Sequence, residues 1–100
     1  MLDFTQIAGF DWDWGNSEKS LSKHGVSQRE AEEIFLDPRL LVLVDDKHSG
    51  EEPHYHAYGS TAAGRLLQAS FTMRRNATLI RIISARAMSR KERVRYGQEV

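Results

Sequence analysis

The sequence contains no cysteine, so neither disulfide bonds nor thiolate metal sites can stabilise the fold, and we expect a protein of the reducing cytoplasm. No apolar run approaches the roughly 20 residues that a membrane-spanning helix needs. The first residues lack the basic stretch and long apolar run of a secretory signal peptide. Internal repeats, low-complexity tracts and linkers are also absent. We therefore expect a single small domain over residues 1–100, without membrane contact.

The charge of the chain is divided along its length. Residues 1–64 contain five basic and twelve acidic residues, whereas residues 65–100 contain nine basic residues and two acidic ones. The formal net charge of zero therefore conceals a C-terminal third with a net charge of +7. Eight of its nine bases are arginine, whose planar guanidinium suits phosphate oxygens better than the ammonium group of lysine does. We therefore expect a nucleic-acid backbone, or an acidic protein that mimics one, as the partner.

The spacing of apolar residues predicts an α+β fold, in which an antiparallel sheet of four to five strands packs against an N-terminal pair of helices, with a C-terminal helix in addition. Asp13 is a predicted helix cap, and Ser27 has the spacing of a capping box with Glu30. Residues 40–44 are an unbroken aliphatic run, which predicts a strand buried on both faces. The predicted strands are 9–13 (at a sheet edge), 40–44, 55–60, 65–74 and 79–84, and the predicted helices are 14–24, 27 to the Asp37-Pro38 stop, and 89–97.

Polar side chains line one face of the strand predicted over residues 65–74. Read with a period of two, this face carries Gln68, Ser70, Thr72 and Arg74, a row of hydrogen-bonding groups that ends in a cation. The opposite face is mostly apolar and is expected to point into the core. The polar row is therefore the first candidate for a substrate groove.

Arg81 and Arg86 are five positions apart, so a regular strand would place them on opposite faces. Either a β-bulge redirects one of them, or Arg86 lies beyond the strand, on the turn into the last helix. We favour the second alternative, because residues 85–88 directly precede the predicted Ser89 cap. With the polar row, one or both arginines would hold an RNA phosphate and stabilise the extra negative charge of pentacoordinate phosphorus. Alternatively, some of the arginines form solvated ion pairs with the acids Asp45, Asp46, Glu51 and Glu52.

The histidines have different predicted roles. His48 lies in a turn among titratable neighbours and is the best placed to act as a general acid or base, although an ordinary loop residue is the simpler interpretation. His54 and His56 share a strand face, and Glu52 would be the third ligand of a metal site, but we favour a polar surface there. His24 is a predicted helix cap. We therefore expect no metal and no cofactor.

Short motifs between Phe10 and Tyr96 occur in the order and at the spacing of a known family. They are Trp12-Asp13, Lys23-His24-Gly25-Val26-Ser27, Glu30-Ala31, Phe35, Asp37-Pro38, His48-Ser49, Glu52, Gly59, Gly64-Arg65-Leu66-Leu67, Thr72, Arg74, Arg81-Ile82-Ile83-Ser84-Ala85-Arg86-Ala87, Glu92-Arg93 and Tyr96. Through these motifs the chain resembles the BrnT toxins, small RelE-like ribonucleases of bacterial type II toxin–antitoxin systems.

The resemblance implies a RelE/ParE-like fold and a cytoplasmic toxin that cuts RNA and so halts translation. It also implies a BrnA-type antitoxin as partner, and contact with operator DNA only through the complex with that antitoxin. Our hypothesis for this chain is an endoribonuclease that cuts mRNA without a metal ion. The 2′-hydroxyl of the RNA would attack the adjacent phosphorus and leave a cyclic phosphate. With His48 as the proton-transfer group, the catalytic residues carried over by position are Arg65, Arg74, Arg81 and Arg86. The expected substrate-binding residues are Gln68, Ser70, Thr72, His54 and Glu52.

Two other functions stay open at this point. The first is a ParE-like toxin that poisons DNA gyrase by binding, without nucleolytic chemistry. The second is a binding module that keeps the antitoxin interface but has lost catalysis, because the family usually has arginine where His54 stands. Growth arrest with RNA loss would separate the ribonuclease from both.

Overall fold

Capping residues set the limits of the helices in the computed structural model, which describes residues 4–47, 50 and 52–99. The Asp13 side chain accepts the backbone N–H of Asn16 at 3.2 Å, and Gly25 ends the first helix with a φ of 63°, in the left-handed region that favours glycine. Ser27 and Glu30 form both hydrogen bonds of a capping box. These predicted caps are confirmed. The helical elements are η1 (Phe4–Gln6), α1 (Trp14–His24), α2 (Gln28–Glu33), η2 (Ile34–Leu36) and α3 (Arg90–Glu99).

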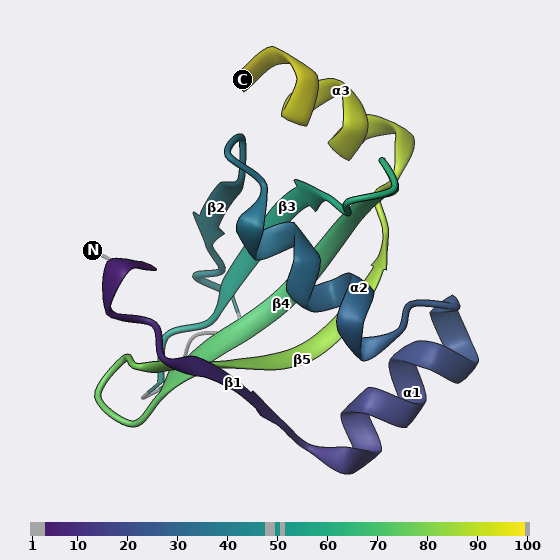
Figure 1. Cartoon of the computed structure of the whole chain (residues 1–100). Coiled ribbons are helices and arrows are strands. Elements are labelled where there is room, and N and C mark those ends of the chain that lie inside the picture. The colour runs from purple at the N-terminus through teal and green to yellow at the C-terminus, as the bar shows by residue number, and fades with distance from the viewer. Residues whose placement is uncertain (1–3, 48–49, 51, 100) are drawn as a thin grey trace.

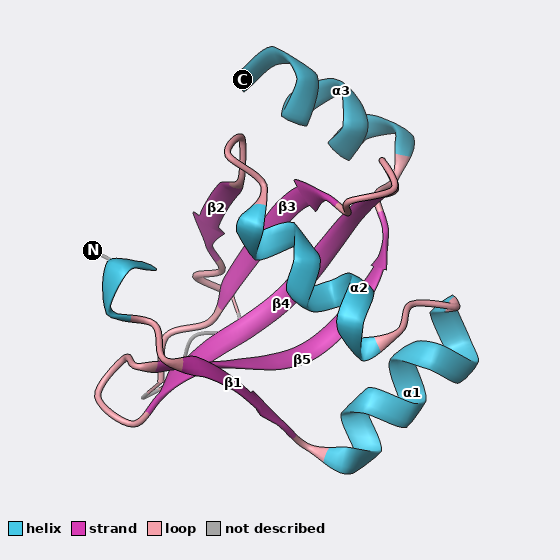
Figure 2. Ribbon diagram, in the orientation of Figure 1, coloured by secondary structure: helices cyan, strands magenta, loops and turns pink. Residues whose placement is uncertain are grey.

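The described residues form one sheet of five strands, in the order β1-β5-β4-β3-β2 (Figures 1 and 2). Neighbouring strands pair antiparallel except β1 and β5, which are parallel, so the predicted α+β class is confirmed with a mixed sheet instead of a wholly antiparallel one. β1 and β5 are not joined by a hairpin, because α1, α2 and the other strands lie between them in the sequence. The two strands can therefore pair in parallel. The strands are β1 (Gly9–Trp12), β2 (Leu41–Val44), β3 (Tyr55–Ser60), β4 (Leu66–Arg74) and β5 (Leu79–Ala87).

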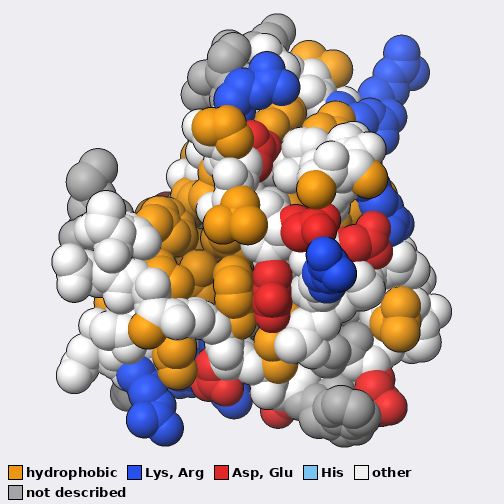
Figure 3. Space-filling view, in the orientation of Figure 1, with side chains coloured by type: hydrophobic (Ala, Val, Ile, Leu, Met, Phe, Trp, Pro, Cys, Tyr) orange, Lys and Arg blue, Asp and Glu red, His pale blue; other side chains and the backbone are white. Residues whose placement is uncertain are grey.

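The hydrophobic core lies between the sheet and the segment formed by α2 and η2. Alternate residues of β4, among them Leu67 and Phe71, are fully buried and pack with Ile34 of η2. In Figure 1 α2 crosses this face of the sheet, and Figure 3 shows hydrophobic side chains gathered between α2 and the N-terminal turn η1. The other face of the sheet carries the polar side chains, as the period of two predicted.

The C-terminal helix is fixed to the rest of the molecule by a tyrosine. Tyr96 is 4 % exposed, and its hydroxyl donates a hydrogen bond to Asp37, which also accepts the backbone N–H of Ser60. Ser89 and Glu92 form a capping box at the start of α3, because each side chain binds the backbone N–H of the other. The helix predicted over 89–97 is therefore confirmed, and it extends to Glu99.

Two strand predictions were wrong. Residues 41–44 form the edge strand β2 and are only half-buried or exposed, because β2 is the last strand of the sheet that the described residues form. The strand predicted to end at Ser84 continues to Ala87, so Arg86 lies within β5 and not on the turn beyond it. A register shift between Ser70 and Phe71 of β4 marks a bulge opposite them in β5, where Ile83 has no partner.

The close contact between β3 and η2 leads to a stability prediction. A Cβ at Gly59 would lie 2.9 Å from the backbone oxygen of Ile34 and 3.0 Å from its Cβ, so we expect Gly59→Ala to cost about 1–3 kcal/mol of unfolding free energy through overpacking. Gly97→Ala is the control, since a Cβ there meets nothing within 4 Å. Urea unfolding of the two variants measures the difference, and equal stability would contradict this account of the contact.

Candidate active site

The bulge in β5 places Arg81 and Arg86 on the same face of the sheet. Arg86 pairs with Gln68 and Arg81 pairs with Thr72, and the unpartnered residue between them absorbs the odd spacing of five. The first of the two alternatives left open by the sequence is therefore the observed one. We call this side of the sheet the polar face; its residues are Asp11 of β1, His56 and Tyr58 of β3, Gln68, Ser70, Thr72 and Arg74 of β4, and Arg81, Ser84 and Arg86 of β5.

Each arginine of the polar face has a carboxylate partner. Arg74 binds Glu52 at 2.9 Å, and Arg81 lies 3.4 Å from Asp11. The acidic half of the chain does supply ion-pair partners, as the alternative interpretation expected. Glu52, the partner of Arg74, is one of the four acids that this interpretation named. The third pair lies within the C-terminal third.

That third pair is bidentate. Arg86 donates to Glu92 from Nη1 at 2.7 Å and from Nη2 at 3.0 Å, so the plane of its guanidinium is fixed. The side chains of Arg74, Arg81 and Arg86 remain between 31 % and 41 % exposed, so a phosphate can approach them from solvent. The Nε atoms of Arg74 and Arg81 are buried and make no hydrogen bond within the described part of the chain. For Arg81 this Nε is the atom that faces Asp11 at 3.4 Å, so that contact is an ion pair without a hydrogen bond.

The carboxylates of this face are held in their charged form. The hydrogen bond from Arg86 lowers the pKa of Glu92, and the hydrogen bond from Thr72 lowers the pKa of Glu52; Arg74 also contributes to the second shift. Glu92 in turn raises the pKa of Arg86 through the same hydrogen bond. Because the folded pKa values of these two glutamates lie below the usual one, their pairs stabilise the fold near neutral pH. That contribution is lost as the pH falls through the lowered values.

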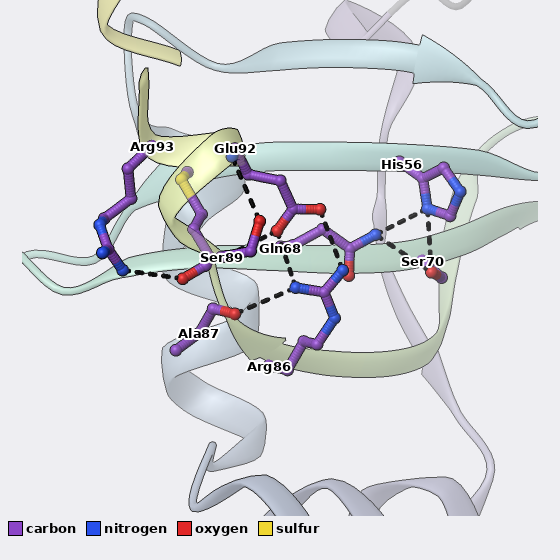
Figure 4. A network of polar contacts seen from close by, with 9 residues as sticks. His56, Gln68, Ser70, Arg86, Ala87, Ser89, Glu92 and Arg93 are labelled. Carbon is purple, nitrogen blue, oxygen red and sulfur yellow. Dashed lines mark hydrogen bonds and ion pairs between the residues drawn. The ribbon is translucent and has the colours of Figure 1, made fainter. Parts of the chain in front are cut away.

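A histidine, His56, lies at the centre of a hydrogen-bond network on the polar face (Figure 4). Its Nδ1 atom is 2.6 Å from Nε2 of Gln68 and 3.0 Å from Oγ of Ser70, while its Nε2 atom is 3.0 Å from Oδ2 of Asp45. Figure 4 shows Gln68 between the His56 ring and the pair of Arg86 with Glu92. Gln68 is only 3 % exposed, so the network is closely packed.

Most of the predicted residues come together on this face. Gln68, Ser70, Thr72, Arg74, Arg81 and Arg86 share it, and Glu52 joins it through its bonds to Thr72 and Arg74. His54 lies two residues before His56 and close enough to Glu52 to influence that carboxylate. The predicted proton-transfer residue His48 lies outside the described residues.

Arg65 is not with the other arginines. Its Nη1 atom donates to the backbone oxygen of Gly25 at 2.8 Å and to Glu30 at 3.1 Å, and its Nη2 atom donates to the backbone oxygen of His24 at 3.4 Å. It therefore binds the carbonyls at the end of α1 and joins the helical pair to the start of β4.

Among the polar residues at this site, His56, Asp11 and Glu92 were missed as site residues. His56 had been considered only as half of a metal pair, Asp11 only as part of an edge strand, and Glu92 only as a helix cap. Glu92 carries a sequence signal, since the spacing Ser89 to Glu92 brings its carboxylate back toward the end of β5. The partnership of Asp45 with His56 had no such signal, because it depends on how β2 and β3 pair.

Comparison with known proteins identifies the family. The family model described as "Ribonuclease toxin, BrnT, of type II toxin-antitoxin system" matches residues 12–92, which is most of the chain. The chain belongs to the BrnT family. A solved structure of the Brucella abortus ribonuclease toxin BrnT matches with a TM-score of 0.63 at 20 % sequence identity, over 82 % of this chain and 97 % of that one. A search of curated proteins finds none that matches the chain.

Membership of the BrnT family gives the chain its general class. Family members are ribonuclease toxins of type II toxin–antitoxin systems, so the chain is a member of a ribonuclease family, and an antitoxin is its expected partner. The likeness to the Brucella abortus toxin supports the fold. Across the described residues, no helix is long and apolar enough to span a membrane.

Proposed function

We propose that this BrnT family member is a metal-independent endoribonuclease that cuts mRNA and so inhibits translation. The observation that carries the proposal is the bulge, which brings Arg81 and Arg86 to one face of the sheet beside Arg74. Three guanidinium groups on one polar face suit a phosphodiester whose negative charge increases during the reaction. The family description supports ribonuclease activity in general, and the choice of mRNA as substrate is part of the proposal.

The proposed reaction uses a nucleophile that the substrate itself supplies. The 2′-hydroxyl attacks the adjacent phosphorus, the bond from phosphorus to the 5′ oxygen breaks, and a 2′,3′-cyclic phosphate remains. Because no water molecule has to be activated, this chemistry requires no metal-bound hydroxide. Arg81 and Arg86 would bind the phosphate oxygens, and Arg74 with Thr72 would hold the neighbouring part of the RNA backbone.

The carboxylates of Asp11, Glu52 and Glu92 hold the free enzyme in a state ready for this substrate. Each one orients a guanidinium that remains about one-third exposed. A phosphate can share such a guanidinium through its remaining N–H groups, because arginine has five donors and a single carboxylate accepts at most two of them. His54 stands close to Glu52 and would add a cation when protonated.

Removing the 2′-hydroxyl tests the proposed reaction. We expect purified protein to cut a single-stranded RNA in the presence of a chelator, and to leave 2′,3′-cyclic phosphate ends detectable by mass spectrometry. A matched RNA with 2′-deoxy residues at the cleaved positions should bind but resist cleavage at those positions. Cleavage of the deoxy positions, or 5′-phosphate products, would contradict attack by the 2′-hydroxyl.

The proposed partner is a BrnA-type antitoxin, and operator DNA would be contacted only through the complex with it. Support comes from the type II family description and from the excess of basic residues in the C-terminal third. An antitoxin that presents acidic residues to the polar face would compete with RNA for the same arginines. Neutralisation would then follow from occupation of the site.

A second function, an antitoxin-binding module without catalysis, is favoured by one observation. All three arginines of the polar face already have carboxylate partners within the chain. If these pairs are stronger than the attraction of a phosphate, RNA would not displace them. Protein that is folded and well expressed but does not arrest growth would favour this function.

A further inference from the structure

Three neighbouring strands bring His56 to the middle of the polar face. His56, Ser70 and Ser84 form one row across β3, β4 and β5. Arg86 lies in the row on one side, opposite Gln68, and Arg81 lies in the row on the other side, opposite Thr72. Rows on one face of a sheet are about 7 Å apart and strands about 5 Å apart, so a phosphate between the two arginines would lie over Ser84. The ribose beside it would then extend toward Ser70 and His56.

The neighbours of the His56 ring determine which of its nitrogens carries the proton. Asp45 lies 3.0 Å from Nε2, and a carboxylate accepts hydrogen bonds only, so the proton belongs on Nε2. Nδ1 then carries the lone pair of the ring. It accepts from the hydroxyl of Ser70 at 3.0 Å and from the amide nitrogen of Gln68 at 2.6 Å. The basic nitrogen of the ring therefore points along the polar face, toward the row of Ser70 and Ser84.

We infer that His56 is the general base of the cleavage reaction and that Asp45 is its positioning residue, an inference that rests on the proposed ribonuclease function. Nδ1 takes the proton of the 2′-hydroxyl as the bond from O2′ to phosphorus forms. The bond from phosphorus to O5′ breaks, and the leaving oxygen takes a proton from water. Asp45 stabilises the positive charge that the ring gains, and Ser70 accepts the new hydrogen bond from Nδ1–H.

Gln68 has to respond to that proton transfer. In the resting state its amide nitrogen donates to Nδ1 and to Ser70. Once Nδ1 carries a proton, two donors would face each other, so the amide turns to present its oxygen. Gln68 is thereby assigned a positioning role, which agrees with its burial among the side chains of this face.

The titratable and charged groups around His56 come from several elements. Asp45 directly follows β2, and its side chain is 11 % exposed; the residues of β4 that contact the His56 ring are the neutral Gln68 and Ser70. Within β3, Tyr58 lies two residues away, and burial, together with Glu92, raises its pKa, so Tyr58 stays neutral near pH 7. The remaining groups of the face and its border are His54, Glu52, Arg74, Arg81 and Arg86.

Single-turnover cleavage of a labelled single-stranded RNA between pH 5 and 9 tests the inference. The wild-type rate should rise with pH as a histidine loses its proton. His56→Gln should lower the rate at neutral pH by about 10²–10⁴-fold and remove that rise, because glutamine accepts no proton. Binding of a DNA strand of the same sequence should be unchanged. His24→Gln, at the exposed end of α1, is the matched control and should behave as wild type.

Asp45→Asn supplies a second readout that a purely structural role would not change. Without the carboxylate the proton of the ring is no longer fixed on Nε2, so the maximal rate should fall while the affinity for the DNA strand stays unchanged. An unchanged pH profile in His56→Gln, with cleavage near the wild-type rate in both His56→Gln and Asp45→Asn, would overturn the inference but leave the ribonuclease function in place. No cleavage by the folded wild-type protein would overturn the proposed function and the inference with it.

Discussion

The double variant Arg81→Ala/Arg86→Ala should lose RNA cleavage while keeping its fold. Each arginine is expected to stabilise the pentacoordinate phosphorus through charged hydrogen bonds, and the loss of one such donor costs about 10²–10³-fold in rate. Because both lie on the polar face next to the row of Ser70 and Ser84, the double variant should fall to the background rate. The measurement is the single-turnover cleavage of a labelled RNA by purified protein, with circular dichroism to establish the fold.

Two further variants separate the chemistry from the charge. Arg29→Ala/Arg90→Ala also removes two positive charges, but from exposed positions on α2 and α3. This control variant should cleave at close to the wild-type rate. Arg81→Lys/Arg86→Lys keeps the charge but loses the bidentate geometry, and it should show an intermediate rate. If the alanine variant of the polar face kept a rate within about tenfold of wild type, these arginines would not be the phosphate-binding groups.

Phe71→Ala should remove activity by another route, the loss of the fold. Phe71 is fully buried, and its ring lies edge-on to Phe35 at 5.2 Å and stacked on Tyr55 at 5.3 Å. Truncating such a ring costs about 3–5 kcal/mol, which is a large part of the roughly 5–15 kcal/mol that holds a small domain folded. Urea unfolding followed by circular dichroism measures the loss.

The control for this core variant is Val94→Ala, because Val94 lies on α3 and is 55 % exposed. It should change the unfolding free energy by no more than about 0.5 kcal/mol. A loss of less than about 1 kcal/mol in Phe71→Ala would mean that the aromatic cluster is not the centre of the core. The comparison with Arg81→Ala/Arg86→Ala matters because only the core variant should be both inactive and unfolded.

Local signals in the sequence were sufficient to predict the helices. Asp13 and Gly25 limit α1 through contacts within the helix and its caps, and the same holds for Ser27 with Glu30. Strand alternation likewise separated the polar and apolar faces of β4. These features involve residues close together in the chain, so their geometry follows from spacing alone.

The arrangement of the candidate active site depends on pairing between strands, which the sequence does not reveal. The bulge opposite Ser70 and Phe71 is one extra residue of β5, Ile83. The residues of β5 on both sides of it stay paired with β4. The network around His56 needs β3 and β4 side by side and Asp45 at the border of β2. Spacing along the chain predicted that Arg86 lies beyond the end of the strand. It gave no indication that His56 contacts Asp45.

Several residues of the family motifs have structural roles in this chain. Arg65 binds the carbonyls at the end of α1, and Asp37 joins Tyr96 to the backbone of Ser60. Glu92 caps α3 and at the same time orients Arg86. Resemblance by motif therefore identified the family but did not separate the arginines of the polar face from Arg65.

The most direct test of the central claim is to induce the chain in a bacterial host without an antitoxin and to follow growth, total RNA and DNA integrity together. We predict rapid growth arrest with loss of mRNA and intact DNA, and no arrest by the Arg81→Ala/Arg86→Ala variant. DNA breaks with intact RNA would identify a gyrase-poisoning toxin instead. Normal growth with folded, well-expressed protein would contradict the ribonuclease assignment and leave a binding module.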